Sequence, residues 1–253
     1  DLSRTNKLNQ ILLTGLEKHE GKSDLSVDWQ VANLSSDEGW DEAVKGCDYV
    51  LHVASPIGME LPKNEDEMVK PAVEGTLRVL EAASKAGVKR VVITSSVAAI
   101  MYGTDKQGVF NEEDWTNPES KTTNVYAKSK TLAEQAAWDF IKKDTTGMEL
   151  STVLPAMVFG PILEEDFGVS VGAILDMMNG KYPIVPNWDM GVVDVRDVAS
   201  LELLAMTKPE AAGKRFVCSA ENMFMKDQNE YLSEIFPESA TKIPKRVAPN
   251  WLI

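Results

Sequence analysis

Three residues that could act together on a carbonyl group occur in two short segments of the 253-residue chain. Tyr126 and Lys130 stand four residues apart and share one face if their segment is helical. Ser96 follows the apolar run 91–93, where a buried strand would end. A hydroxyl, a phenol and an ammonium at one edge of a parallel sheet could orient a carbonyl oxygen and donate a proton to it. The spacing therefore indicates a site for carbonyl reduction by a nicotinamide.

Carbonyl reduction would require a different role from each of these three side chains. A free phenol has a pKa near 10, and a nearby ammonium favours the phenolate, so we expect Lys130 to lower the pKa of Tyr126. Ser96 would hold the carbonyl oxygen within reach of the Tyr126 proton. The alternative, that Ser96 caps a strand end and Tyr126 fills a groove, stays open on residue pattern alone.

Two other motifs imitate catalytic patterns. Tyr102 and Lys106 have the same spacing, but turn residues follow Tyr102 at 103–105, so we expect no shared helical face there. Residues 168–172 read Gly-Val-Ser-Val-Gly, the pattern of a hydrolase nucleophile elbow. Such a serine needs a later histidine, and none follows His52. We therefore favour the pair Tyr126 and Lys130 and reject a serine hydrolase.

Strand-like and helix-like segments alternate between residues 29 and 218, which predicts an α/β fold with a doubly wound parallel sheet. Gly87 follows a helical pattern and is the expected C-cap. Turn residues become frequent after residue 160, so we predict a dinucleotide-binding domain at 1–160 and mainly a substrate-binding lobe at 161–253. Residues 190–220 are expected to return to the main sheet. The predicted strands are 29–32, 48–53, 89–95, 149–154, 192–193 and 215–218, and the predicted helices are 38–45, 65–86 and 125–143.

Composition excludes several classes of protein. A formal charge of −13 disfavours nucleic acid and anionic membranes, and no apolar run is long enough for a membrane span. His19 and His52 are the only histidines, so no histidine-rich metal site is expected. Cys47 and Cys218 form no close pair, and we expect both to be small buried hydrophobes. We expect a cytoplasmic protein with a small-molecule substrate; the oligomeric state is left open.

Six ordered blocks resemble the extended short-chain dehydrogenase/reductases, in the dihydroflavonol-4-reductase-like branch that includes cinnamoyl-CoA reductases. The blocks are residues 51–56, 73–76, 90–96, 126–134, 154–161 and 192–199. The resemblance implies a Rossmann-like fold and NADPH-dependent reduction of an aldehyde or ketone. It implies that Ser96, Tyr126 and Lys130 are the catalytic residues.

The same resemblance implies a set of cofactor contacts. Lys130 would hold the nicotinamide ribose, and Ser170 would contact the diphosphate. Arg4 and Lys7 are candidates for the 2′-phosphate of NADPH, with Lys7 the better; solvated surface charge is the alternative for both. The implied dinucleotide contacts are Asn33, Leu34, Val53, Ala54, Ser55, Thr94, Tyr126, Lys130, Pro155, Ala156, Met157, Val158 and Ser170.

The chain departs from the family pattern in two places. Asn33 stands where the family usually has an aspartate beside the adenine. The first strand and its Gly-x-x-Gly-x-x-Gly turn, which bring backbone N–H groups onto the pyrophosphate, are missing from the sequence. We therefore expect a fragment of a longer sequence, which also stops short of the usual C-terminal helices, with poor cofactor affinity as it stands.

Two other functions use the same architecture. A nucleotide-sugar epimerase or dehydratase carries the same trio with tightly held NAD, although the dehydratases usually have Asp-Glu next to a threonine where this chain has Ser95-Ser96 after Thr94. A non-catalytic dinucleotide-binding protein is the third possibility.

Overall fold

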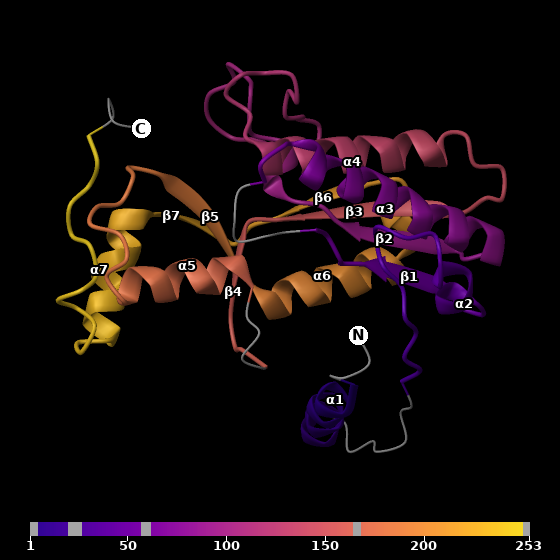
Figure 1. Cartoon of the computed structure of the whole chain (residues 1–253), viewed down its shortest axis with the longest axis horizontal. Coiled ribbons are helices and arrows are strands. Elements are labelled where there is room, and N and C mark those ends of the chain that lie inside the picture. The colour runs from indigo at the N-terminus through magenta and orange to yellow at the C-terminus, as the bar shows by residue number, and fades with distance from the viewer. Residues whose placement is uncertain (1–4, 20–26, 57–61, 164–167, 250–253) are drawn as a thin grey trace.

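A parallel four-stranded sheet forms the centre of the computed structural model, which describes residues 5–19, 27–56, 62–163 and 168–249. Its strands are β1 (Tyr49–His52), β2 (Arg90–Thr94), β3 (Glu149–Pro155) and β6 (Arg215–Cys218), in the order β1-β2-β3-β6. Helices cover both faces, with α3 (Asp66–Ala86) and α4 (Val125–Ile141) on one side and α6 (Val195–Thr207) on the other (Figure 1). This is the predicted α/β fold, in which covered parallel strands are apolar on both faces.

One part of the core lies between the sheet and the helix pair α3 and α4. Leu80, Val91 and Leu150 are almost fully buried there, at 0 to 1% exposure. Burial of each such side chain contributes roughly 1.5–3 kcal/mol. The helix that carries Tyr126 and Lys130 is thus fixed against the sheet by apolar packing, before any polar contact is considered.

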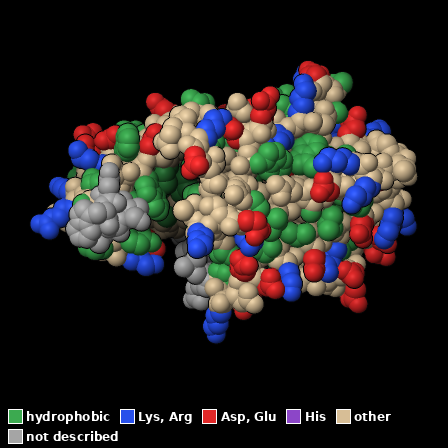
Figure 2. Space-filling model, turned by 90° about the horizontal axis from the view of Figure 1, so that it is seen from above, with side chains coloured by type: hydrophobic (Ala, Val, Ile, Leu, Met, Phe, Trp, Pro, Cys, Tyr) green, Lys and Arg blue, Asp and Glu red, His purple; other side chains and the backbone are tan. Residues whose placement is uncertain are grey.

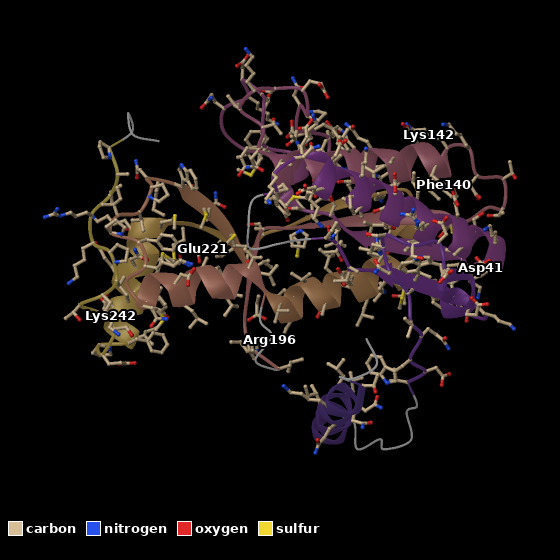
Figure 3. The ribbon with its side chains drawn as sticks, in the orientation of Figure 1. Asp41, Phe140, Lys142, Arg196, Glu221 and Lys242 are labelled. Carbon is tan, nitrogen blue, oxygen red and sulfur yellow. The ribbon has the colours of Figure 1, made fainter. Side chains whose placement is uncertain are left out.

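A second, mixed sheet lies beyond the carboxyl ends of the main strands. It consists of β4 (Met157–Phe159), β5 (Asp189–Asp194) and β7 (Glu221–Phe224), flanked by α5 (Val169–Met178) and α7 (Met225–Ile235). In Figure 3, Glu221 marks this sheet and Lys142, after α4, marks the opposite end of the molecule. Within 190–220, β6 lies in the main sheet and β5 in the second. The domain boundary at residue 160 stays a prediction.

Most predicted elements are found within a few residues of their expected bounds. The predicted strand 29–32 is wrong, because these residues are irregular and no described strand lies beside them to form a ladder. The structure adds the helix α1 (Thr5–His19) and shortens the predicted helix 38–45 to α2 (Trp40–Val44). Within the described ranges, short 3-10 helices occur at Val97–Ala99 and Pro209–Ala211.

Gly87 ends α3 in the left-handed region, with φ 74°, and its N–H bonds to the carbonyls of Ala83 and Ser84. The predicted C-cap is confirmed. Cys218 is buried as expected, but Cys47 is exposed, because it lies in the turn after α2 rather than in a packed element.

Acidic and basic side chains are interspersed over the face shown in Figure 2, with hydrophobic side chains between them. No continuous basic stripe crosses that face. None of the helices in the described ranges has the length and apolar content that a bilayer span requires.

Candidate active site

The start of α4 positions Tyr126 and Lys130. Asn124 is the N-cap, and its Oδ1 accepts a hydrogen bond from the Ala127 N–H at 2.9 Å. This cap satisfies one of the free donors of the first turn and fixes where the helix begins. Tyr126 is the second residue of the helix and Lys130 lies one turn later, so the helical spacing places both on one face.

Ser96 lies just beyond the carboxyl end of β2. Its backbone is extended, with φ −166° and ψ 153°, and its Oγ accepts from the Ala98 N–H at 3.1 Å. The Ser96 side chain also lies close enough to the Tyr126 phenol to lower its pKa. The structure thus brings together the serine and the tyrosine, which are thirty positions apart in the chain.

Lys130 is buried, with 6% exposure, and its Nζ donates to the Thr94 carbonyl oxygen at 3.2 Å. Burial lowers the pKa of Lys130 from 10.5 to about 8, and the Glu134 carboxylate opposes this by raising it. Burial disfavours the charged form of an amine, which is the reason for the direction. Lys130 therefore ties α4 to the end of β2.

The pKa of Tyr126 differs from the sequence-based expectation. Burial raises the pKa of the phenol, the nearby Ser96 side chain lowers it, and Tyr102 raises it. The predicted lowering by Lys130 is absent from these causes, because the ammonium is directed at the Thr94 carbonyl instead. The phenol consequently keeps its proton at neutral pH.

His52, the last residue of β1, adds a titratable group to the same region. It is 7% exposed, and its Nε2 lies 3.5 Å from Thr76 Oγ1. Burial, with a smaller effect of the Lys130 charge, lowers the pKa of His52 to about 4. The imidazole is therefore neutral at physiological pH. Its role as a strand-end packing residue was expected; its proximity to Lys130 was not.

A small cavity lies among these elements. It measures about 20 Å³, enough for one water molecule and far too small for a dinucleotide. Five residues that the resemblance assigns to the cofactor line it: Leu34, Ala54, Ser55, Thr94 and Lys130. The remaining lining comes from His52, Pro56, Ala72, Thr76, Ile93, Ser95, Ala133 and Glu134.

Other predicted cofactor residues lie outside this cavity. Asn33 is exposed and accepts from the Ser35 N–H through Oδ1 at 2.9 Å, and Val53 is 56% exposed at the end of β1. Pro155 ends β3, and residues 156–158 lead into the second sheet. Ser170 lies in the first turn of α5, with its Oγ 4.0 Å from the Met157 sulfur.

Of the two candidates for the 2′-phosphate, the structure describes only Lys7 and does not bring it to the trio. Arg4 lies outside the described residues, and Lys7 is an exposed residue of α1, which stands apart from both sheets (Figure 1). The assignment of either residue to NADPH stays a prediction.

The competing pair Tyr102 and Lys106 lies in a loop, as predicted. Gly103 and Gly108 have positive φ angles of 67° and 91°, which no helix contains. Lys106 Nζ forms an ion pair with Asp114 at 2.5 Å. Tyr102 and Lys106 therefore do not share a helical face.

Sequence reasoning missed Glu134 as part of the site. It is 1% exposed and lies one helical turn after Lys130. A signal was available, because an acidic residue at this spacing falls on the same helical face as Tyr126 and Lys130. Its partner Arg215 could not be found from spacing, since it is 81 residues away.

Comparisons with known proteins agree with this architecture. The model of the 3-beta hydroxysteroid dehydrogenase/isomerase family matches residues 4–235. Cinnamoyl-CoA reductase 1 of Petunia hybrida is 38% identical over 82% of this chain, and an anthocyanidin reductase of Vitis vinifera is 32% identical over 82% of it. The structure of yeast methylglyoxal/isovaleraldehyde reductase complexed with NADPH has a TM-score of 0.77 and 31% identity, covering 96% of this chain and 77% of that one.

A parallel sheet with helices on both faces and a Ser-Tyr-Lys group at its carboxyl edge defines an extended short-chain dehydrogenase/reductase. The chain belongs to the 3-beta hydroxysteroid dehydrogenase/isomerase family within that class. It spans 61% of the petunia reductase and 65% of the grapevine reductase. A UDP-glucose 4-epimerase of Thermotoga maritima shares the fold, with a TM-score of 0.73 at 20% identity.

Proposed function

We propose that the protein reduces an aldehyde or ketone to an alcohol with NADPH. The observation that carries this proposal is the convergence of Ser96, the Tyr126 phenol and the buried Lys130 at the carboxyl edge of a parallel sheet. Ligands bind at this edge in open α/β sheets. The family supports the reaction class, and the yeast reductase supports the choice of NADPH.

Tyr126 is the proton donor in this proposal. Its raised pKa keeps the phenol protonated at neutral pH, so it can give a proton to the oxygen that gains charge during reduction. Ser96 holds that oxygen by a second hydrogen bond and so fixes its distance from the phenol. Lys130 keeps α4 against Thr94 and would hold the ribose.

The cofactor would supply hydride to the carbonyl carbon. Leu34, Ala54, Ser55, Thr94 and Lys130 would lie along part of it, because they gather at the strand ends where such cofactors bind. We assign residues 161–253 mainly to substrate binding, since the second sheet lies beyond those ends.

The test compares Tyr126→Phe with Tyr102→Phe in an assay of NADPH oxidation against a panel of aldehydes and ketones. Loss of the proton donor should lower turnover by about 10²–10⁴-fold. NADPH binding, measured by fluorescence, should stay nearly unchanged. Tyr102→Phe removes a phenol from the rejected pair and should retain turnover.

Three results would contradict the proposal. Undiminished activity in Tyr126→Phe would remove its role as donor. Dinucleotide binding without reduction of any carbonyl would favour a non-catalytic protein. Turnover of a sugar nucleotide alone, without consumption of added NADPH, would favour an epimerase or dehydratase.

A further inference from the structure

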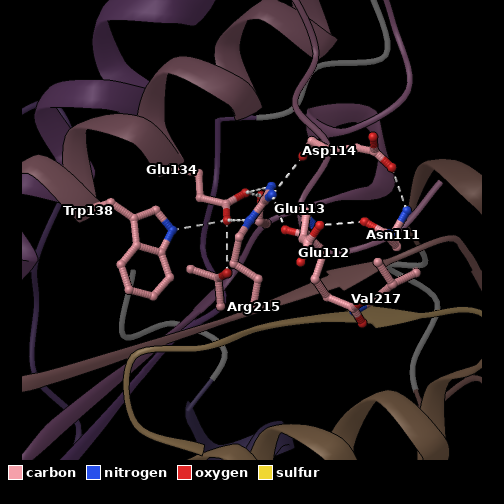
Figure 4. A network of polar contacts seen from close by, with 10 residues as sticks. Asn111, Glu112, Glu113, Asp114, Glu134, Trp138, Arg215 and Val217 are labelled. Carbon is pink, nitrogen blue, oxygen red and sulfur yellow. Dashed lines mark hydrogen bonds and ion pairs between the residues drawn. The ribbon is translucent and has the colours of Figure 1, made fainter. Parts of the chain in front are cut away.

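The carboxylate of Glu134 accepts hydrogen bonds from four side chains (Figure 4). Oε2 accepts from Ser95 Oγ at 2.6 Å, and Oε1 accepts from Thr152 Oγ1 at 2.8 Å and Trp138 Nε1 at 3.2 Å. Arg215 Nε donates to Oε1 at 2.7 Å and its Nη2 to Oε2 at 3.3 Å. One buried charge thus joins the end of β2, β3, α4 and β6.

Arg215 extends this network to the loop between residues 100 and 124. Its Nη1 donates to the carbonyl oxygens of Glu112 and Asp114, both at 2.7 Å. The guanidinium lies 3.7 Å from the ring centroid of Trp115, a cation–π contact. The loop is held a second time, where the Val217 N–H donates to Glu112 Oε1 at 3.0 Å.

The network borders the proposed trio on two sides. Ser95 is the residue before Ser96, and Glu134 lies one turn after Lys130 and two turns after Tyr126. Thr94 and Ser95 bond to opposite faces of the sheet, with Thr94 Oγ1 donating to Glu202 of α6 and Ser95 to Glu134 of α4. The strand end that carries Ser96 is therefore fixed from both sides.

We propose that Glu134 is a positioning residue: its bonds to Ser95 and Arg215 hold the serine strand, helix α4 and the 112–115 loop in the one arrangement that aligns Ser96, Tyr126 and Lys130. This role rests on the proposed function for its effect on turnover. Its effect on Lys130 does not need turnover and can be measured without cofactor or substrate.

Removal of the carboxylate charge has a specific consequence at Lys130. Glu134 raises the pKa of Lys130. Among the described residues, His52 of β1 also interacts with the Lys130 charge, and the Tyr126 phenol lies one turn before Lys130 on α4. Glu202 of α6 and Arg215 of β6 bond to Thr94 and Glu134, the two groups next to the ammonium. Glu134→Gln removes the negative charge that lies near both the Lys130 ammonium and the Arg215 guanidinium. Lys130 should then lose its proton at a lower pH.

The experiment compares Glu134→Gln with the matched variant Glu149→Gln. Glu149 also accepts from a buried arginine, Arg90 at 2.6 and 2.8 Å, but at the amino end of the sheet. Acetylation of Lys130 is followed against pH by mass spectrometry in the cofactor-free protein. We expect its midpoint to move to lower pH in Glu134→Gln and to stay at the wild-type value in Glu149→Gln.

Turnover gives the second measurement. Misplacement of the trio should lower kcat by about 10- to 100-fold in Glu134→Gln, with little change in KM for NADPH. Glu149→Gln should retain wild-type kcat. Glu134→Asp keeps the charge on a shorter side chain, so it should restore the Lys130 midpoint while recovering kcat only in part.

The outcomes separate the two proposals. If the wild type reduces no carbonyl but the Lys130 midpoint shifts in Glu134→Gln alone, the proposed function fails and the coupling of Glu134 to the trio stands. An unchanged midpoint together with unchanged kcat would overturn the positioning role. If Glu134→Gln does not fold, Arg215→Lys tests the same contact from its other side. Unchanged hydrogen exchange at residues 112–115 and unchanged kcat in Arg215→Lys would overturn the positioning role of Glu134.

Discussion

Two arginines with largely buried side chains, Arg90 at 5% and Arg215 at 9% exposure, make the same kind of cluster at different places in one sheet. Arg90 donates to Glu149 through Nε and Nη2, and its Nη1 donates to the carbonyl oxygens of Ala205 and Lys208 at 2.7 and 2.6 Å. Arg215 donates to Glu134 and, through Nη1, to two loop carbonyls at 2.7 Å. Each arginine thus joins one carboxylate to backbone carbonyls distant in the chain, at the end of α6 for Arg90 and in the 112–114 loop for Arg215.

The two clusters differ in how far the carboxylate is removed from water. The Glu149 side chain is 46% exposed, whereas that of Glu134 is 1% exposed. At the amino end, solvent can replace a lost partner; beside the trio it cannot. The Arg90–Glu149 pair therefore stabilises the amino end of the sheet, whereas the similar Arg215–Glu134 pair determines the charge balance of the proposed site.

The largest expected effect is on stability. Glu134→Gln leaves a buried guanidinium without its counter-charge and should lower the free energy of unfolding by about 3–5 kcal/mol. Glu149→Gln breaks a pair that solvent can reach and should cost about 0–1 kcal/mol. Urea denaturation of both variants measures the difference. Equal losses would show that burial of the carboxylate is not what separates the two clusters.

A second effect concerns the buried ammonium near Glu134. The pKa of Lys130 is about 8 in the folded protein and 10.5 as a free side chain. Below pH 8 the amine is charged in both states, and its burial destabilises the fold by roughly 3 kcal/mol. Between pH 8 and 10.5 only the unfolded state keeps the proton, so stability rises with pH.

Lys130→Met should therefore be more stable than the wild type at pH 7, by up to about 3 kcal/mol, and this advantage should shrink as pH rises toward 10.5. Urea midpoints at several pH values measure it. If the difference in the free energy of unfolding between the two proteins stays constant across that range, the pKa of Lys130 is not lowered in the folded protein.

The smallest effect comes from His52. Its pKa is about 4 when folded and 6.5 when free, so the unfolded state binds more protons between these values. The wild type should lose about 2 kcal/mol between pH 7 and pH 5 from this group. His52→Gln should lose less over the same interval. Urea denaturation of both proteins at pH 7 and pH 5 measures this difference. An equal loss of the free energy of unfolding in both proteins would show that a group other than His52 causes the acid sensitivity.

The sequence predicted the parts of the site that depend on local spacing. Tyr126 and Lys130 could be placed because a helix of strong formers puts positions four apart on one face. Ser96 could be placed because it ends an apolar run. The Gly87 cap and the rejection of Tyr102 rested equally on local turn chemistry.

The unpredicted parts depend on contacts between distant segments. Arg215 meets Glu134 only after β3 and β6 pair, with Thr152 beside Arg215 in the register. The direction of the Tyr126 pKa depends on burial and on where the Lys130 ammonium donates, and neither follows from sequence distance. The strand predicted at 29–32 failed for the related reason that a strand needs a neighbour.

The position of three site residues on a single helix has a consequence for how the site can vary. Tyr126, Lys130 and Glu134 follow one another at intervals of four residues along α4. An insertion or deletion of one residue between any two of them would turn the later ones by about 100° around the helix axis. The proposed donor, its neighbouring cation and the buried anion must therefore keep their spacing together, whereas the second sheet can change length and reshape the proposed substrate pocket without moving them.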